Sequence, residues 1–255
     1  MATTIRQETV VTSEKTLPDT PWFRRVFGIV AGVCALFVVF TTAAMFLYPG
    51  GAGPSATTHG YQFFLNFFSD LGRTRTQSGA ANYPSMLLFS TAMLAVGGGA
   101  GTFFVAFARY FATHTTTPLA RRLNWAATGA GLLAAVFFAG VGLTPYNLFL
   151  PEHQVASNGA FYLLLLAVLL EIAALRRTRS IPAPLLWVNI AFVVVLTGYV
   201  LVMSFGPPTS TLAGDMTHVV AQKLIVYTAI ATIFSQALLL RAHLARPRAA
   251  IAPAA

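Results

Sequence analysis

The sequence predicts an all-α membrane protein: a bundle of six transmembrane helices, with a short amphipathic helix at the interface between helices one and two. Three observations support this fold class. The 255 residues are 56% hydrophobic and only 9% charged, which lies outside the range of soluble domains. Six apolar windows reach the ~20 residues that a helix needs to cross the hydrocarbon core. Thirteen of the sixteen Lys and Arg residues fall on one side of these windows.

The six windows use about half of the chain by the length rule for spans and leave no room for a second folded domain. They are Val26 to Leu47, Ser85 to Ala108, Leu123 to Leu143, Ala156 to Leu175, Leu185 to Phe205, and Val219 to Leu240. Only Glu171 and Lys223 place a formal charge inside a window. We therefore predict one membrane domain over residues 21–241, with flexible cytoplasmic tails at residues 1–20 and 242–255.

The basic residues predict the orientation. They flank the first and sixth windows and occupy the second and fourth connections, whereas the other connections carry only Arg73 and Arg75. Because cytoplasmic loops collect Lys and Arg, both termini are expected in the cytoplasm of a multi-pass cell-membrane protein. The net charge of +9 then needs no nucleic-acid partner, since no basic stripe is interleaved with exposed aromatic residues. Cys34 is the single cysteine, so neither a disulfide framework nor a thiol metal site is expected.

The connection between the first two windows is the longest and lies on the outer side. Its Gly- and Pro-rich residues 49–54 predict an irregular turn. Over residues 61–72, apolar and polar side chains occupy opposite helical faces, which is typical of an amphipathic interfacial helix. The polar face is made by Gln62, Asn66, Ser69 and Asp70. The glycines of windows two and three, including residues 97–101, 129, 131, 140 and 142, favour close helix packing over a ligand site.

Polar groups gather at the outer ends of the helices and are the candidate site. Asp70, His153, Asp215 and His218 are the candidate catalytic residues, because a carboxylate that orients a His makes a general base. The same four residues are the candidate ligands of a zinc-like cation. The alternative is that these groups only cap helices and link them by hydrogen bonds. No motif indicates a cofactor or decides whether a reaction is catalysed.

Lys223 and Ser69 are the candidate lipid-binding residues. A charged Lys at the centre of a span costs about 2.5–3.5 kcal/mol, so Lys223 is expected to snorkel outward, to pair with Asp70 or Asp215, or to bind an anionic headgroup. Glu171 is expected to snorkel or to pair with Arg176 and Arg177 at the inner end of the fourth span.

Three short stretches resemble the motifs of a known group of membrane proteins. Phe68-Ser69-Asp70-Leu71-Gly72 with Asn82-Tyr83-Pro84 is similar to a diagnostic stretch of six-span bacterial and archaeal proteins of a domain-of-unknown-function family, which is related to the eukaryotic Frag/DRAM/Sfk group. His153 with Ser157 and Gly159 resembles the second motif of that group, and His218 with Gln222-Lys223 the third, although Lys223 departs from it. The resemblance implies the same six-span topology, and some eukaryotic relatives are associated with lipid-anchor remodelling, phosphoinositide signalling or autophagy. It implies no particular chemistry.

Two functions are therefore open, and a third is weaker. The first is a lipid-handling protein that binds or modifies headgroups in an outer pocket, with membrane lipids as partners. The second is a non-catalytic scaffold or regulator, in which the same residues only hold helices together. A small-solute transporter is less favoured, because the sequence has neither an internal repeat nor paired breaks at the middle of the spans.

Overall fold

The computed structural model describes residues 20–53, 55–178 and 180–245 and contains six long helices. They are α1 Thr20–Leu47, α2 Tyr83–His114, α3 Pro118–Leu143, α4 Leu150–Leu175, α5 Ala183–Phe205 and α6 Leu212–Ala245. Each contains one of the predicted windows and is long and apolar enough to cross a membrane. The all-α six-helix bundle is therefore confirmed, and the chain is an integral membrane protein. Helix α6 continues to Ala245 and so includes residues 242–245, which were predicted to belong to the C-terminal tail; the predicted tails otherwise lie outside the described part, which leaves out residues 1–19 and 246–255.

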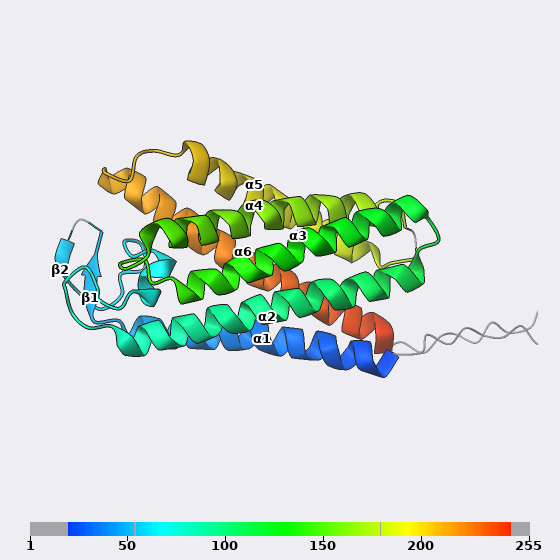
Figure 1. Ribbon diagram of the computed structural model, residues 1–255, viewed down its shortest axis with the longest axis horizontal. Helices are drawn as coiled ribbons and strands as arrows, with labels where there is room; N and C mark the ends of the chain where they lie inside the picture. The colour runs from blue at the N-terminus through cyan, green and yellow to red at the C-terminus, as the bar shows by residue number, and fades with distance from the viewer. Residues whose placement is uncertain (1–19, 54, 179, 246–255) are drawn as a thin grey trace, which may run out of the picture.

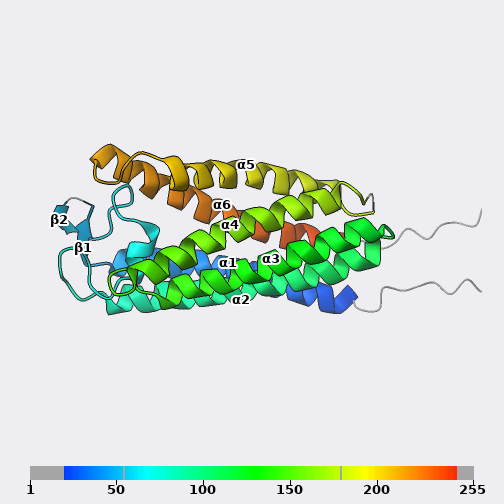
Figure 2. The same ribbon diagram turned by 45° about the horizontal axis from the view of Figure 1, so that its top comes forward.

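The six helices form a closed ring in chain order (Figures 1 and 2). Each packs against the next, and α6 contacts both α5 and α1. Helix α1 begins where α6 ends, and this end of the bundle carries the helix termini nearest to Arg24, Arg109, Arg121, Arg177 and Arg241. We call it the basic end. The opposite end carries the α1–α2 connection with its two short strands, and we call it the hairpin end.

Proline marks the starts of α2, α3, α4 and α5. Pro84, Pro118, Pro151 and Pro184 lie in the first two positions of α2, α3, α4 and α5. The missing N–H of proline costs nothing there, because the first N–H groups of a helix have no partner within it. Each connection therefore ends at its proline, and each of these helices begins within a few residues of the predicted apolar window.

The α1–α2 connection differs from the predicted amphipathic helix. Only residues 68–72 are helical, as the 3₁₀ helix η1 Phe68–Gly72, and residues 63–65 form a turn before it. The preceding glycine-rich segment forms an antiparallel hairpin of β1 Gly50–Ala52 and β2 Ser55–His59. Gly50 has φ of 137°, and a Cβ there would lie 2.2 Å from the Thr58 carbonyl oxygen. The polar face of this segment is buried, because Asn66, Ser69 and Asp70 turn inward. The Asn66 and Asp70 side chains bond there to backbone groups.

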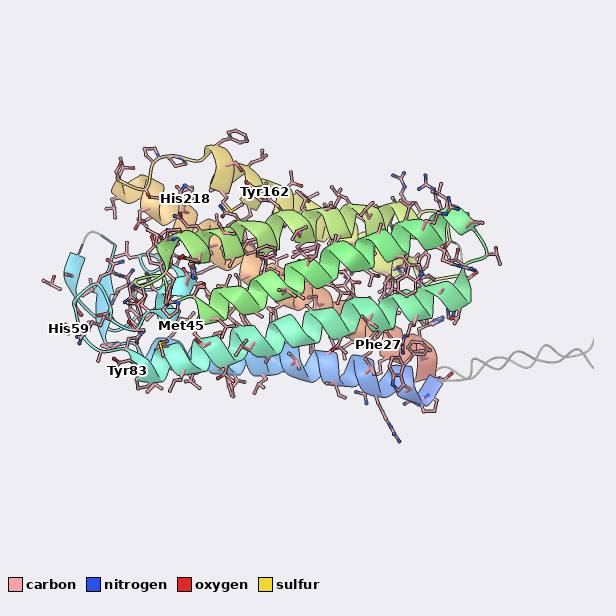
Figure 3. All side chains as sticks on the ribbon, in the orientation of Figure 1. Phe27, Met45, His59, Tyr83, Tyr162 and His218 are labelled. Atoms are coloured by element: carbon pink, nitrogen blue, oxygen red, sulfur yellow. The ribbon has the colours of Figure 1, made fainter. Side chains whose placement is uncertain are left out.

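Aromatic side chains fill the ring toward the basic end, and glycines let the helices approach each other. Phe27 of α1 (Figure 3) packs edge-to-face against Phe103 and Tyr110 of α2. On the neighbouring pair, Gly131 of α3 lies directly under the ring of Phe104, where a Cβ would be 2.5 Å from the ring carbons. Close approach through small residues is the packing expected in lipid.

Replacement of Gly131 by Ala should destabilise the bundle. The buried Phe104 ring would have to move or strain its rotamer, at a cost of about 1–3 kcal/mol. Gly129 is the matched control, because it lies on the same helix and a Cβ there meets nothing within 4 Å. Thermal unfolding in detergent should show a lower Tm for Gly131→Ala and no loss for Gly129→Ala. An equal Tm for the two variants would contradict this packing.

Candidate functional site

A cavity of about 520 Å³ opens at the hairpin end, between α4, α5, α6 and the α1–α2 connection. His218 of α6 lies at this end in Figure 3. The polar side chains that line the cavity include Ser69, Asp70, Arg73, Tyr146, His153, Ser157, Asn158, Asp215, His218 and Gln222. Its apolar lining includes Phe67, Tyr199, Met203 and Leu212. The cavity thus has polar and apolar walls side by side.

Asp70 is held by three donors from its own connection. Its Oδ2 accepts the Phe67 backbone N–H at 2.9 Å and the Asn66 amide at 3.2 Å, and its Oδ1 lies 3.5 Å from Arg73 Nη1. Burial raises the pKa of Asp70, whereas the Asn66 amide and the Arg73 guanidinium oppose that rise. An Asp that accepts an N–H three residues earlier stabilises the first turn of η1 as a cap does. Asp70 therefore shapes the cavity wall, and little of its bonding capacity is left for a ligand.

Lys223 lies behind the same wall and does not line the cavity. Its ammonium donates to the Asn66 backbone carbonyl and lies 5.3 Å and 5.1 Å from the ring centroids of Tyr61 and Phe63. Only 3% of the residue is exposed. The charge is thus stabilised by a carbonyl dipole and by two aromatic faces. The expected pairing with Asp70 or Asp215 is not the contact that the structure shows.

His153 presents one ring nitrogen that has no hydrogen-bond partner among the residues that the structure describes. Its Nδ1 lies 2.7 Å from the Thr144 carbonyl oxygen, and because a carbonyl only accepts, Nδ1 carries a proton. In the neutral ring Nε2 is then the unprotonated nitrogen. The edge-to-face contact with Tyr146 at 5.5 Å fixes the ring plane. His153 is thus oriented by α4 and by the α3–α4 connection, as a hydrogen-bond acceptor or a general base would be.

Asp215 and His218 lie one turn apart at the start of α6, and both line the cavity. The His218 ring Nε2 donates to the Pro207 carbonyl oxygen at 3.0 Å, so its Nδ1 is the nitrogen left for a ligand. Asp215 is 9% exposed, and its buried Oδ2 has no hydrogen-bond partner among the described residues. A Cβ at Gly53 would lie 3.0 Å from that oxygen. A buried carboxylate oxygen without a donor is costly, so Asp215 is the group in the cavity with most to gain from a ligand.

Five of the six predicted site residues meet at this cavity: Ser69, Asp70, His153, Asp215 and His218. The sixth, Lys223, does not. Within the described residues no group of three or more His, Cys, Asp or Glu side chains is close enough to hold a metal ion. Arg73 was not predicted as a site residue, yet it is part of the cavity wall, and its guanidinium lies 5.3 Å from the Tyr146 ring centroid. The sequence feature that could have indicated Arg73 is its position on the outer side, away from the side on which most Lys and Arg residues lie.

A second polar cluster lies inside the bundle near the basic end and corrects the prediction for Glu171. Glu171 is 2% exposed and makes no ion pair with Arg176 or Arg177. Its Oε1 accepts the Asn189 amide at 3.0 Å, and Asn189 Oδ1 accepts the Gln236 amide at 3.0 Å. The carboxyl points into the ring, where α5 and α6 supply amide donors, so it does not reach the arginines beyond the end of α4. The signal for this cluster was two amides in otherwise apolar windows.

Comparison of the chain with protein-family models, with proteins of curated function and with solved structures finds no match in any of the three. Function therefore has to be inferred from the cavity and its side chains.

The two cavity carboxylates should respond differently to truncation. Asp70→Ala would leave the buried Phe67 N–H and the Asn66 amide without their acceptor, at about 1–3 kcal/mol for each unsatisfied group. Asp215→Ala removes a carboxylate that has a bare oxygen, and the loss is limited to its favourable place at a helix N-terminus, about 0.3–1 kcal/mol. Thermal unfolding in one detergent should therefore give a clearly lower Tm for Asp70→Ala than for Asp215→Ala. The reverse order would show that Asp215 has the structural role.

Proposed function

We propose that this protein binds the polar headgroup of a membrane lipid in the cavity at the hairpin end. The observation that carries the proposal is the buried Oδ2 of Asp215, which has no hydrogen-bond partner in the described part of the chain and belongs to a cavity that also presents Arg73, His153 and His218. Binding sites combine apolar walls with a few convergent polar groups. Here the apolar walls come from spanning helices, on which acyl chains lie.

The charges favour a headgroup that carries both a phosphate and a hydroxyl or amine. Arg73 uses one nitrogen for Asp70, and its planar guanidinium has further donors for a phosphate oxygen. Asp215 accepts a hydroxyl or an ammonium, and the free ring nitrogens of the two histidines accept or donate according to their protonation. His153 is also oriented to take a proton from a hydroxyl or from water, so modification of the headgroup is compatible with the same site.

The proposal includes the orientation of the protein in the cell membrane and its relationship to the Frag/DRAM/Sfk group. The concentration of arginines at one end supports a cytoplasmic basic end, with the hairpin end on the outer side of the cell membrane. The relationship to the Frag/DRAM/Sfk group is supported by the meeting of its three resemblance stretches, around Asp70, His153 and His218, at one cavity.

A scaffold function has its own support. Asn66, Asp70 and Lys223 are fully engaged with protein groups, as residues that only lock helices together would be. Their engagement does not extend to Asp215, which is why lipid binding is the preferred proposal.

Isosteric removal of one charge tests the proposal. Asp215→Asn should weaken retention of the bound lipid about tenfold or more, because hydrogen bonds to charged groups contribute about 1.5–3 kcal/mol. Native mass spectrometry of protein purified in mild detergent identifies and counts the retained lipid. Glu152→Gln is the matched control, since Glu152 is an exposed acid at the same end that does not line the cavity.

The result depends on the difference between the two variants. Lipid retained by wild type and Glu152→Gln but lost from Asp215→Asn, at equal Tm, supports the headgroup site. If wild-type protein retains no lipid, or if both variants retain it equally, the scaffold function is preferred.

A further inference from the structure

A groove of about 540 Å³ lies between α1 and α6 at the basic end, far from the cavity described above. It is lined by Pro21, Arg24, Arg25, Gly28, Ile29 and Arg241. The first five residues belong to the start of α1, and Arg241 belongs to the last turns of α6. The blue and red ends of the two helices lie side by side in Figure 1, and the two helices are in contact. Segments more than 200 residues apart in the chain thus bring three guanidinium groups to one groove.

The guanidinium of Arg241 lies across a notch in α1. A Cβ on Gly28 would be 3.0 Å from Arg241 Nη1 and 3.6 Å from its Cζ, and would meet no other atom within 4 Å. Glycine at this position therefore leaves the space into which the α6 arginine reaches. The contact places Arg241 beside Arg24 and Arg25, in spite of their mutual repulsion.

These three arginines lack the kind of partner that Arg109, Arg121 and Arg177 of the basic end have. Arg177 donates to the Ala173 carbonyl at 2.7 Å, Arg121 donates to the Thr115 carbonyl at 3.3 Å, and Arg109 lies over the Trp22 ring. Within the described residues, the guanidinium groups of Arg24, Arg25 and Arg241 make no hydrogen bond and no ion pair.

No acid of the described chain can neutralise them. Asp70, Glu152 and Asp215 belong to the hairpin end, and Glu171 is buried against Asn189. The groove therefore carries three positive charges that only a group from outside the described residues can neutralise.

We propose that this groove binds the phosphate of one anionic phospholipid. Planar guanidinium groups match phosphate oxygens with paired donors, and basic pockets between spanning helices are sites for anionic headgroups. Ile29 is exposed one turn farther along α1, toward the middle of the span, and offers an apolar surface to an acyl chain. The lipid would join the first and last helices of the ring at the point where α6 closes it.

Binding of phosphatidylglycerol tests the proposal. Protein stripped of lipid is titrated with dioleoylphosphatidylglycerol and, separately, with dioleoylphosphatidylcholine, and bound lipids are counted by native mass spectrometry. In wild type the groove should bind one phosphatidylglycerol in preference to phosphatidylcholine. The double variant Arg24→Gln/Arg241→Gln should bind it about tenfold or more weakly, since each basic residue near a membrane surface contributes on the order of 1 kcal/mol.

Two variants separate a built site from general attraction to basic residues. Arg122→Gln/Arg177→Gln removes the same charge from the same end without touching the groove, and should retain most of the binding. Gly28→Leu keeps every charge but fills the notch, and should lose binding about as much as the double arginine variant, with an unchanged Tm. Equal losses in the two double variants, or normal binding by Gly28→Leu, would overturn the proposal.

The alternative to a lipid is that acidic side chains of the N-terminal segment bind in the groove. Glu8, Glu14 and Asp19 precede the described residues, and neutralising them to Gln, Gln and Asn leaves the groove intact. If wild type shows no preference for phosphatidylglycerol and this variant acquires one, the N-terminal segment occupies the groove and the proposal fails. The titrations are repeated in an Asp215→Asn background, in which the proposed headgroup site at the hairpin end is weakened, so that the loss caused by the groove variants is assigned to the groove.

Discussion

The structure of the hairpin end depends on the hydrogen bonds made by the side chain and the backbone carbonyl of Asn66. Its Nδ2 donates to the Gly51 carbonyl at 2.8 Å and to Asp70 Oδ2 at 3.2 Å, and its Oδ1 accepts the Gln62 N–H at 2.9 Å. Its backbone carbonyl accepts the Lys223 ammonium. One fully buried residue thus ties the β hairpin, the turn before η1 and helix α6 together. The Phe68 N–H, which donates to Gln222 Oε1 at 2.7 Å, adds a second bond from the connection to α6.

The bonds made by Asn66 decide which charges remain for a ligand. Lys223 is taken by a carbonyl and two aromatic rings, and Asp70 by its own backbone and Arg73. Tyr61 closes the same corner, since its hydroxyl donates to the Asn66 and Phe67 carbonyls and burial raises its pKa. Asp215 remains with a bare oxygen. Burial of an unpaired charge is costly, so the fold concentrates that cost at the one carboxylate that faces the cavity and has no protein donor.

The sequence predicted the features that the bilayer dictates. In lipid the backbone N–H and C=O groups of a single span have to form hydrogen bonds within their own helix. A long apolar window therefore predicts a helix, and all six windows are helical. Proline at the helix starts and arginine at one end follow equally general rules. The convergence of Asp70, His153, Asp215 and His218 on one cavity was predicted only because all four lie at helix ends of the same side.

The features that were missed depend on contacts between distant residues. Period 3.6 over residues 61–72 predicts a regular helix, but the inward-turned amides and carboxylates there bond to the backbone, which leaves a helix of one turn. The partner of Lys223 was expected to be an acid, because charge pairing can be listed from sequence whereas the direction of the Asn66 carbonyl cannot. Glu171 likewise has arginines nearby in the chain, yet its carboxyl faces Asn189 across the bundle.

The cavity and the Glu171 cluster follow from two different ways of joining helices. From α1 to α4, glycines bring backbones close, as Gly99 does against Val33, Gly131 against Phe104 and Gly159 against Phe137. From α4 to α6 the link is a ladder of amides that runs from Gln236 through Asn189 to Glu171, near the basic end. The ladder joins all three helices near the basic end. Near the hairpin end, α4 and α5 are joined again by the Tyr162–Ser204 hydrogen bond at 2.9 Å and by the contact of the Phe161 and Tyr199 rings. Among the described residues no such hydrogen bond joins α6 to α4 or α5 there, and the cavity lies between these helices at that end.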